Sequence, residues 1–157
     1  MKKVIFFFLF SISCFAQVHN FYVKNNSLVW ENVIITNQDN IPEFIAHHPR
    51  LSIASSNHSY KGKGTEIRHT CEGCSSYMDN ELSFDFEIKL REGKYSIIVY
   101  NLIYTVMSQE NHRKIIIADS IMLKKGGIRN DLNKDLTCLD IYFNRIFSMT
   151  GIYKNKL

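Results

Sequence analysis

Two cysteines separated by two residues, Cys71 and Cys74 in the stretch CEGC, are the residues whose spacing first suggests chemistry. Such a pair can be a redox-active dithiol, half of a zinc site or a disulfide. A thioredoxin-like pair starts a helix that follows a strand, whereas this pair lies between the polar stretches SYKGKGTEIRHT and SSYMDN. The pattern predicts a loop, and its chemistry depends on the compartment of the protein.

The first 16 residues have the pattern of a secretory signal peptide. A positive start with two lysines precedes an apolar stretch, residues 4–12, that is too short to span a bilayer. Cleavage is expected after the small residue Ala16, which leaves residues 17–157 as a single domain. The alternative is a lipoprotein that keeps Cys14 as its acylated N-terminus.

Removal of this leader lowers the formal net charge from +4 to +2, because Lys2 and Lys3 leave with it. The remaining charges alternate in sign without a basic run, so no nucleic-acid partner is expected. No later segment is apolar over the length of a transmembrane helix. These features predict an exported protein that is periplasmic, bound to the cell envelope or secreted.

Export favours a loop disulfide between Cys71 and Cys74, because exported cysteines usually pair with one another. Unpaired thiols and a metal site remain as alternatives. A zinc site would need further ligands from the histidines, namely His69 with His58, His47 or His48. Cys138 falls on an apolar helix face and is expected to be an inert buried thiol.

Other patterns have simpler structural explanations. Asp85 and Glu87 share a strand face, as the paired carboxylates of a glycosidase would, but Lys89 and Arg91 share it too, which favours a solvated, charge-balanced surface. The KGKG of residues 61–64 lacks the Ser or Thr and the apolar helix that follow a phosphate-binding loop. No catalytic residue, cofactor or metal ligand is assigned.

The elements that carry these residues are mostly strands. FYV and LVWENVII predict a hairpin with a polar turn, and Asn40 and Pro42 begin a short helix that ends before Pro49. RLSIASS and YKGKGTEIRH predict two weaker strands, the second broken by glycines and placed at a sheet edge. RKIIIADSIML predicts a further strand.

The clearest signal is ELSFDFEIKLREGKYSIIVYNLIYTV. Its first half alternates apolar and charged residues, as a strand with one wet face does. After a turn at Glu92 and Gly93, residues 95–107 are apolar on both faces, which predicts a central strand covered by a helix on one side and by another layer on the other. Apolar residues recur at helical spacing from Leu132 to Phe147, so a long amphipathic helix capped by Asn130 or Asp131 closes the chain.

These motifs resemble an exported Bacteroidetes domain of unknown function with a TBP-like fold, the domain of unknown function 4468 family. NSLVWENVIIT, a helix, and then FEIKLREGKYSIIVYNL follow the order of that family over most of residues 17–157. The residues that match its pattern are Trp30, Val33, Glu87, Lys89, Gly93, Tyr95 and Asn101. Ser96, the CEGC loop and residues 111–127 depart from it.

The resemblance implies an α+β fold, a curved antiparallel sheet with two helices packed on one face, and it brings no known activity, cofactor or catalytic residue. The favoured hypothesis is a non-catalytic module that binds an envelope protein or ligand with its sheet face. The alternative is a small hydrolase-like enzyme that uses the face of Asp85 and Glu87 or the histidines. A deep pocket gathering His, Asp or Glu would favour the enzyme, and a shallow sheet surface would favour the binding module.

Overall fold

The computed structural model describes residues 20–36, 40–56, 59–107 and 113–148. Within these residues seven strands form one antiparallel sheet in the order β1-β2-β6-β5-β4-β3, and β7 pairs with the second half of β6. The strands are β1 (Phe21–Lys24), β2 (Ser27–Ile35), β3 (Leu51–Ser56), β4 (Ser59–Ile67), β5 (Glu81–Arg91), β6 (Lys94–Met107) and β7 (Arg113–Ile117). The predicted signal peptide, Cys14 and His58 lie outside the described residues.

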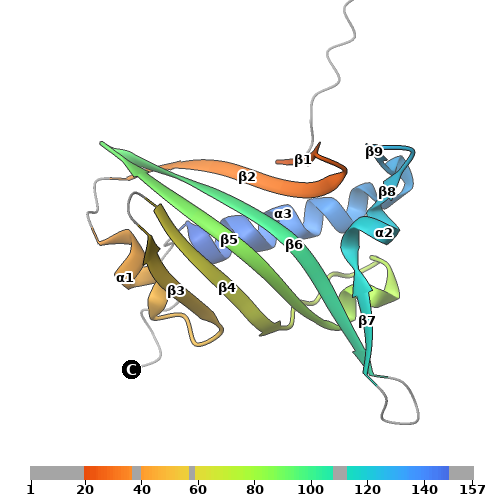
Figure 1. Cartoon of the computed structure of the whole chain (residues 1–157). Helices are drawn as coiled ribbons and strands as arrows, with labels where there is room; N and C mark the ends of the chain where they lie inside the picture. The colour runs from red at the N-terminus through yellow and green to blue at the C-terminus, as the bar shows by residue number, and fades with distance from the viewer. Residues whose placement is uncertain (1–19, 37–39, 57–58, 108–112, 149–157) are drawn as a thin grey trace, which may run out of the picture.

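One face of this sheet is covered by the helix α3 (Asn133–Phe147), which lies behind the strands in Figure 1. The helix α1 (Ile41–Ala46) packs beside β3 and adds Ile41 and Ile45 to the same core. The smaller elements are α2 (Ala118–Met122), the hairpin of β8 (Leu123–Lys124) and β9 (Gly127–Ile128), and two 3-10 turns, Ser76–Asp79 and Asn130–Leu132. The α+β architecture and the curved antiparallel sheet are confirmed.

The hairpin turns follow from residues that tolerate left-handed backbone. Asn25 and Asn26 join β1 to β2 with φ of 52° and 61°, the combination that a two-residue type I′ turn requires. Gly93 joins β5 to β6 with φ of 68°, a conformation that glycine adopts at no steric cost. Both predicted turns are therefore confirmed.

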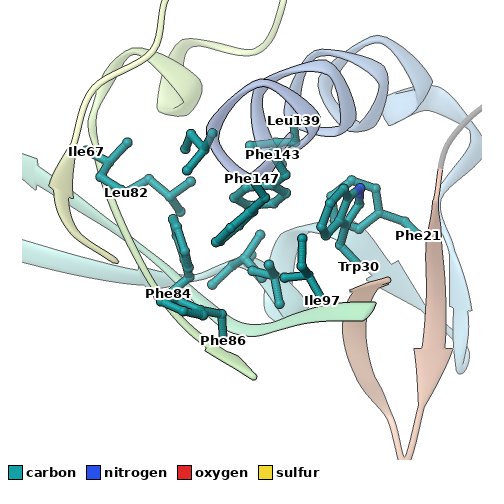
Figure 2. Packing of buried hydrophobic residues seen from close by; sticks show 14 of the residues in the cluster. Phe21, Trp30, Ile67, Leu82, Phe84, Phe86, Ile97, Leu139, Phe143 and Phe147 are labelled. Atoms are coloured by element: carbon teal, nitrogen blue, oxygen red, sulfur yellow. The ribbon is translucent and has the colours of Figure 1, made fainter. Parts of the chain in front are cut away.

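The core lies between α3 and the sheet and includes a cluster of aromatic rings (Figure 2). Phe143 packs against Trp30 and Phe84, with ring centroids 5.3 and 5.1 Å apart. One turn further along α3, Phe147 packs edge-on against Phe86 at 5.2 Å. These rings come from β2, β5 and α3, so the helix predicted from its apolar spacing closes the sheet as expected.

The prediction that YKGKGTEIRH lies at a sheet edge is wrong, since β4 lies between β3 and β5. Its glycines make room for aromatic rings: a side chain at Gly64 would place its Cβ 2.5 Å from the Phe84 ring, and one at Gly62 would collide with Phe86. Glycine in a strand often marks such a close approach. The two glycines of KGKG thus take part in the core packing, while Lys61 and Lys63 are exposed.

Three further expectations need correction. RKIIIADSIML forms β7 and then the short helix α2, so only its first half is a strand. No described element covers the second face of β6, although its position between β5 and β2 confirms that it is central. Asn130 and Asp131 form a 3-10 turn before α3 and provide no side-chain cap for it.

Candidate functional site: the open face of the sheet

The sheet face opposite α3 is exposed across β4, β5, β6 and β2, and we call it the open face. Phe84, Phe86 and Ile88 of β5 point into the core, so Asp85 and Glu87 must point to the open face. The strand register places further side chains beside them in cross-strand rows. Lys63, Asp85 and Tyr100 form one row, Lys61, Glu87, Ile98 and Glu31 the next, and Lys89, Ser96 and Val33 the third.

Charges on the open face are paired with one another. Lys63 Nζ lies 3.9 Å from Asp85, and Lys89 Nζ lies 3.7 Å from Glu87. These two ion pairs confirm the predicted charge balance of this strand face. Such exposed pairs contribute little stability, so their main effect is to leave a surface without a strong net charge.

Two tyrosines border this charged area. Tyr22 donates a hydrogen bond to Glu31 at 2.7 Å, and burial together with this carboxylate raises the pKa of Tyr22 to about 12. Burial, with smaller contributions from Asp85 and Glu87, also raises the pKa of Tyr100. Both phenols therefore remain neutral donors near physiological pH.

Two open hollows flank Lys63 and Asp85. The first, of about 390 Å³, lies between these residues and the end of β7, and Asn101 donates a hydrogen bond to Asp85 at its wall, at 2.8 Å. The second, of about 410 Å³, lies over β3 and β4 and is bounded by Tyr100. Both are wide rather than deep, so a ligand here would stay largely in contact with solvent.

The described histidines do not line these hollows. His47 and His48 follow α1, where His47 Nδ1 lies 2.7 Å from the Glu43 carbonyl and His48 Nδ1 accepts the Arg50 N–H. His69 is buried at 7% exposure, and burial lowers its pKa. The described residues thus bring no histidine to Asp85 and Glu87.

The residues that carried the family resemblance have divided roles. Trp30 is buried and donates its indole N–H to Asp140 of α3 at 2.7 Å. Tyr95 is buried and donates its hydroxyl to the Phe147 carbonyl oxygen. These two side chains attach the central strands to both halves of α3.

The other resemblance residues lie at the surface or in irregular backbone. Val33 is 52% exposed and lies with Lys89 on the open face. Gly93 occupies the β5–β6 turn, as described above. Asn101 has φ of 54° where the pairing of β5 with β6 shifts register, and this bulge turns its amide toward Asp85.

In place of the predicted disulfide between Cys71 and Cys74, the structure bonds Cys71 to Cys138 and leaves Cys74 with a free thiol. Cys138 is accordingly not the inert buried thiol that its helix position suggested. The loop after β4 folds onto α3, which brings together cysteines 67 residues apart. No spacing rule could indicate this contact, since it depends on the tertiary fold. The three sulfur atoms lie close together, but the disulfide removes two of them as thiolate metal ligands, and His69 is not part of the group.

Two acids of α3, the buried Asp135 and the half-buried Asp140, were missed by sequence reasoning. Asp135, 2% exposed, accepts hydrogen bonds from the Ser75 N–H at 3.0 Å and the Tyr77 hydroxyl at 2.5 Å. Asp140 accepts the Asn20 N–H at 3.1 Å as well as the Trp30 indole N–H. Both acids directly flank core leucines of the helix, which is the signal that could have identified them.

Across the described residues, no helix combines the length and apolar character needed to cross a membrane. No protein-family model and no curated protein matches the chain. Among solved structures it is similar to a TBP-like protein from Parabacteroides distasonis, with a TM-score of 0.56 and 10% identity over 80% of this chain and 91% of that chain. It is also similar to a DUF4468 family protein from Bacteroides ovatus, with a TM-score of 0.45 and 10% identity over 90% of this chain and 93% of that chain. The first similarity shows that the chain has the TBP-like fold of the Bacteroidetes domain that its sequence resembles.

Proposed function

We propose that the protein is an exported, non-catalytic envelope protein whose residues 17–157 act as one domain and bind a partner with the open face. The observation that carries this proposal is the composition of that face. It presents neutral phenols, paired charges and exposed aliphatic side chains on a rigid sheet, with hollows that are wide and shallow.

A polypeptide partner fits this surface better than a small molecule does. Small-molecule sites enclose most of the ligand, whereas protein interfaces combine an apolar centre with a polar rim. Val33, Ile98 and Tyr100 supply apolar area, and Lys61, Glu87 and Lys89 supply polar groups beside it. Val33 is 52% exposed and Ile35 is 84% exposed, so the apolar area reaches the end of β2.

Affinity capture from the native envelope tests this proposal. The bait is the chain without its leader. It is compared with a variant carrying Val33→Ser and Tyr100→Ala and with the control Glu43→Ala, which changes an exposed position of α1. We expect the same partner with the wild type and the control and at least a tenfold loss with the double variant. Equal recovery with all three baits, each shown to be folded by its melting curve, would overturn the open face as the binding surface.

The alternative is a small hydrolase that uses Asp85 in the hollow where Asn101 holds it. Asp85→Asn and Glu87→Gln separate the two functions. A binding module should keep its partner within a few-fold in both variants. Loss of a biological activity in either variant, at unchanged melting temperature, would instead favour the enzyme.

A further inference from the structure

Three sulfur atoms meet where the loop after β4 packs on α3. The Sγ atoms of Cys71, Cys74 and Cys138 all lie within 4.8 Å of one another. Cys71 and Cys138 form the disulfide, with Cα atoms 6.1 Å apart, and Cys74 is the free thiol. A free thiol in contact with a disulfide is the starting arrangement for thiol–disulfide exchange.

The backbone of the CEGC stretch would also allow a disulfide between Cys71 and Cys74. The Cys74 N–H donates to the Cys71 carbonyl at 3.3 Å, and Gly73 between them has φ of 73°, so the stretch forms a closed β-turn. A β-turn holds its first and last Cα atoms within about 7 Å, which overlaps the range that a disulfide spans. Cys71 can therefore pair with either neighbour after small backbone movements.

We propose that the three cysteines form an exchange site in which the disulfide of Cys71 alternates between Cys138 and Cys74. The Cys74 thiolate attacks Cys71 Sγ, and the new sulfur–sulfur bond forms as the bond to Cys138 breaks. The electron pair leaves on Cys138 Sγ, which takes up the proton that Cys74 released. One disulfide and one thiol are present before and after, so no outside oxidant or reductant is needed.

The surroundings of Cys74 make this exchange slow at neutral pH. Burial, followed by the Asp135 carboxylate that accepts its proton in a hydrogen bond, raises the pKa of Cys74, while Lys134 of α3 lowers it. Asp79 of the 3-10 turn adds to the rise, and Tyr104 of β6 also faces the thiol. Since the thiolate is the attacking species, alkaline pH should speed the exchange.

Exchange would change how α3 is attached. The Cys71–Cys138 bridge ties the loop to the helix across 67 residues, whereas a Cys71–Cys74 bridge closes only the turn. After exchange no covalent bond would join the loop to α3, and the hydrogen bonds to Asp135 would remain. The site therefore acts as a covalent latch between the loop and the helix that covers the core.

Thiol mapping of residues 17–157, the chain without its leader and therefore without Cys14, tests the proposal on protein purified without reductant. Samples held at about pH 7 and about pH 9 are quenched with acid, alkylated with N-ethylmaleimide, digested and sequenced by mass spectrometry. A hollow of about 400 Å³ is lined by both Cys71 and Cys138, so a released sulfur is accessible to the reagent. We expect the label to move from Cys74 to Cys138 with time, at least tenfold faster at the higher pH.

Label that stays on Cys74 alone after a day at the higher pH would overturn the exchange, and label on Cys71 would overturn the assignment of Cys138 as the leaving sulfur. Cys74→Ser is the matched control and should take up no label at either pH. Cys138→Ser, exposed to air, should bridge Cys71 to Cys74 and also take up none. Two labelled cysteines in the folded Cys138→Ser chain would contradict the proposed product.

Discussion

At the scale of single residues, Gly62 and Gly64 leave space for aromatic rings of the core. The rings of Phe86 and Phe84 occupy the space that side chains on β4 would otherwise fill. At Gly62 the carbonyl oxygen of Ser52, on the neighbouring strand, closes the same space. Because backbone atoms cannot move aside as a flexible side chain can, Gly62 is the less replaceable of the two.

Gly62→Ala should therefore destabilise the fold by about 1–3 kcal/mol, the usual cost of overpacking a core. Urea unfolding measures this loss. Gly127→Ala is the matched control, since the nearest atom to its added Cβ is the Lys124 carbonyl oxygen at 3.9 Å, and it should stay within about 0.5 kcal/mol. Equal effects of the two substitutions would mean that Phe86 moves aside freely.

Phe86→Ala should cost about 3–5 kcal/mol, because it leaves a cavity between β4 and Phe147 in a fully buried position. The neighbouring substitutions Asp85→Asn and Glu87→Gln should fall within about 0.5 kcal/mol, since these side chains lie on the solvated open face. Thermal melts of the three variants check both statements. A large loss in either carboxylate variant would show that the open face contributes to folding.

Sequence reasoning succeeded at residues whose environment is set by their own strand. The alternation in β5 placed Phe86 in the core and Asp85 and Glu87 in solvent, as the structure has them. It failed where a distant residue decides the environment. The glycines of KGKG do not indicate by themselves that the Phe86 ring fills the space beside them. The spacing of CEGC likewise does not indicate that Cys71 forms a disulfide with Cys138.

At the scale of elements, α3 is held by carboxylates as well as by its apolar face. Asp140 receives N–H donors from Asn20 and Trp30, and Asp135 receives donors from Ser75 and Tyr77. Each acid joins the helix to a segment 58 to 120 residues away in the sequence. The helix itself was predictable from its apolar period, but these long-range attachments were not.

Asp135→Asn should weaken the attachment of α3 in a pH-dependent way. Burial raises the pKa of Asp135, but hydrogen bonds from Ser75 and Tyr77 outweigh burial and leave the pKa below its usual value. The ionised carboxylate therefore stabilises the fold above about pH 4, and this contribution disappears as the pH falls through the lowered pKa.

Urea unfolding at neutral and acidic pH measures this effect. The variant should lose about 1.5–3 kcal/mol at neutral pH, the range for hydrogen bonds to a charged group, and the difference from wild type should shrink in acid. Asn133→Ala is the control, because it changes an exposed position of the same helix without adding a charge. A difference that grows in acid would show that Asp135 is protonated in the folded protein.

The disulfide affects the stability of the whole molecule because it links distant parts of the chain. Closing a loop of 67 residues restricts the unfolded state by about 4 kcal/mol in the chain-entropy model. Cys138→Ser should lose most of this stabilisation even when Cys71 pairs with Cys74, since that bridge closes a very short loop. Cys74→Ser should cost only about 1 kcal/mol. Calorimetry without reductant checks the order of the two melting temperatures.

At the scale of the whole molecule, it was only partly predictable that the sheet is covered on one face and open on the other. Residues 95–107 suggested two covering layers, because Ile98 and Ile103 are as apolar as the core residues between them. In the fold both side chains are half-buried on the open face, where Ile98 lies beside Glu87 and Ile103 lies between Ser83 and Ile117. Long polar side chains can shield apolar area in this way, so composition alone does not distinguish a second layer from a shielded surface.

Export is a prediction about the whole molecule that lies outside the described residues. Two lysines, a short apolar stretch and Ala16 predict that signal peptidase releases a chain beginning at Gln17, or at its cyclised form. Intact-mass measurement of protein from the native host tests this. A chain that retains Met1 would contradict export through this leader, and a lipid-modified Cys14 would replace the released form with an acyl-anchored one. Ala16→Arg should block cleavage of the released form and leave a precursor heavier by the leader, because the peptidase requires a small residue there.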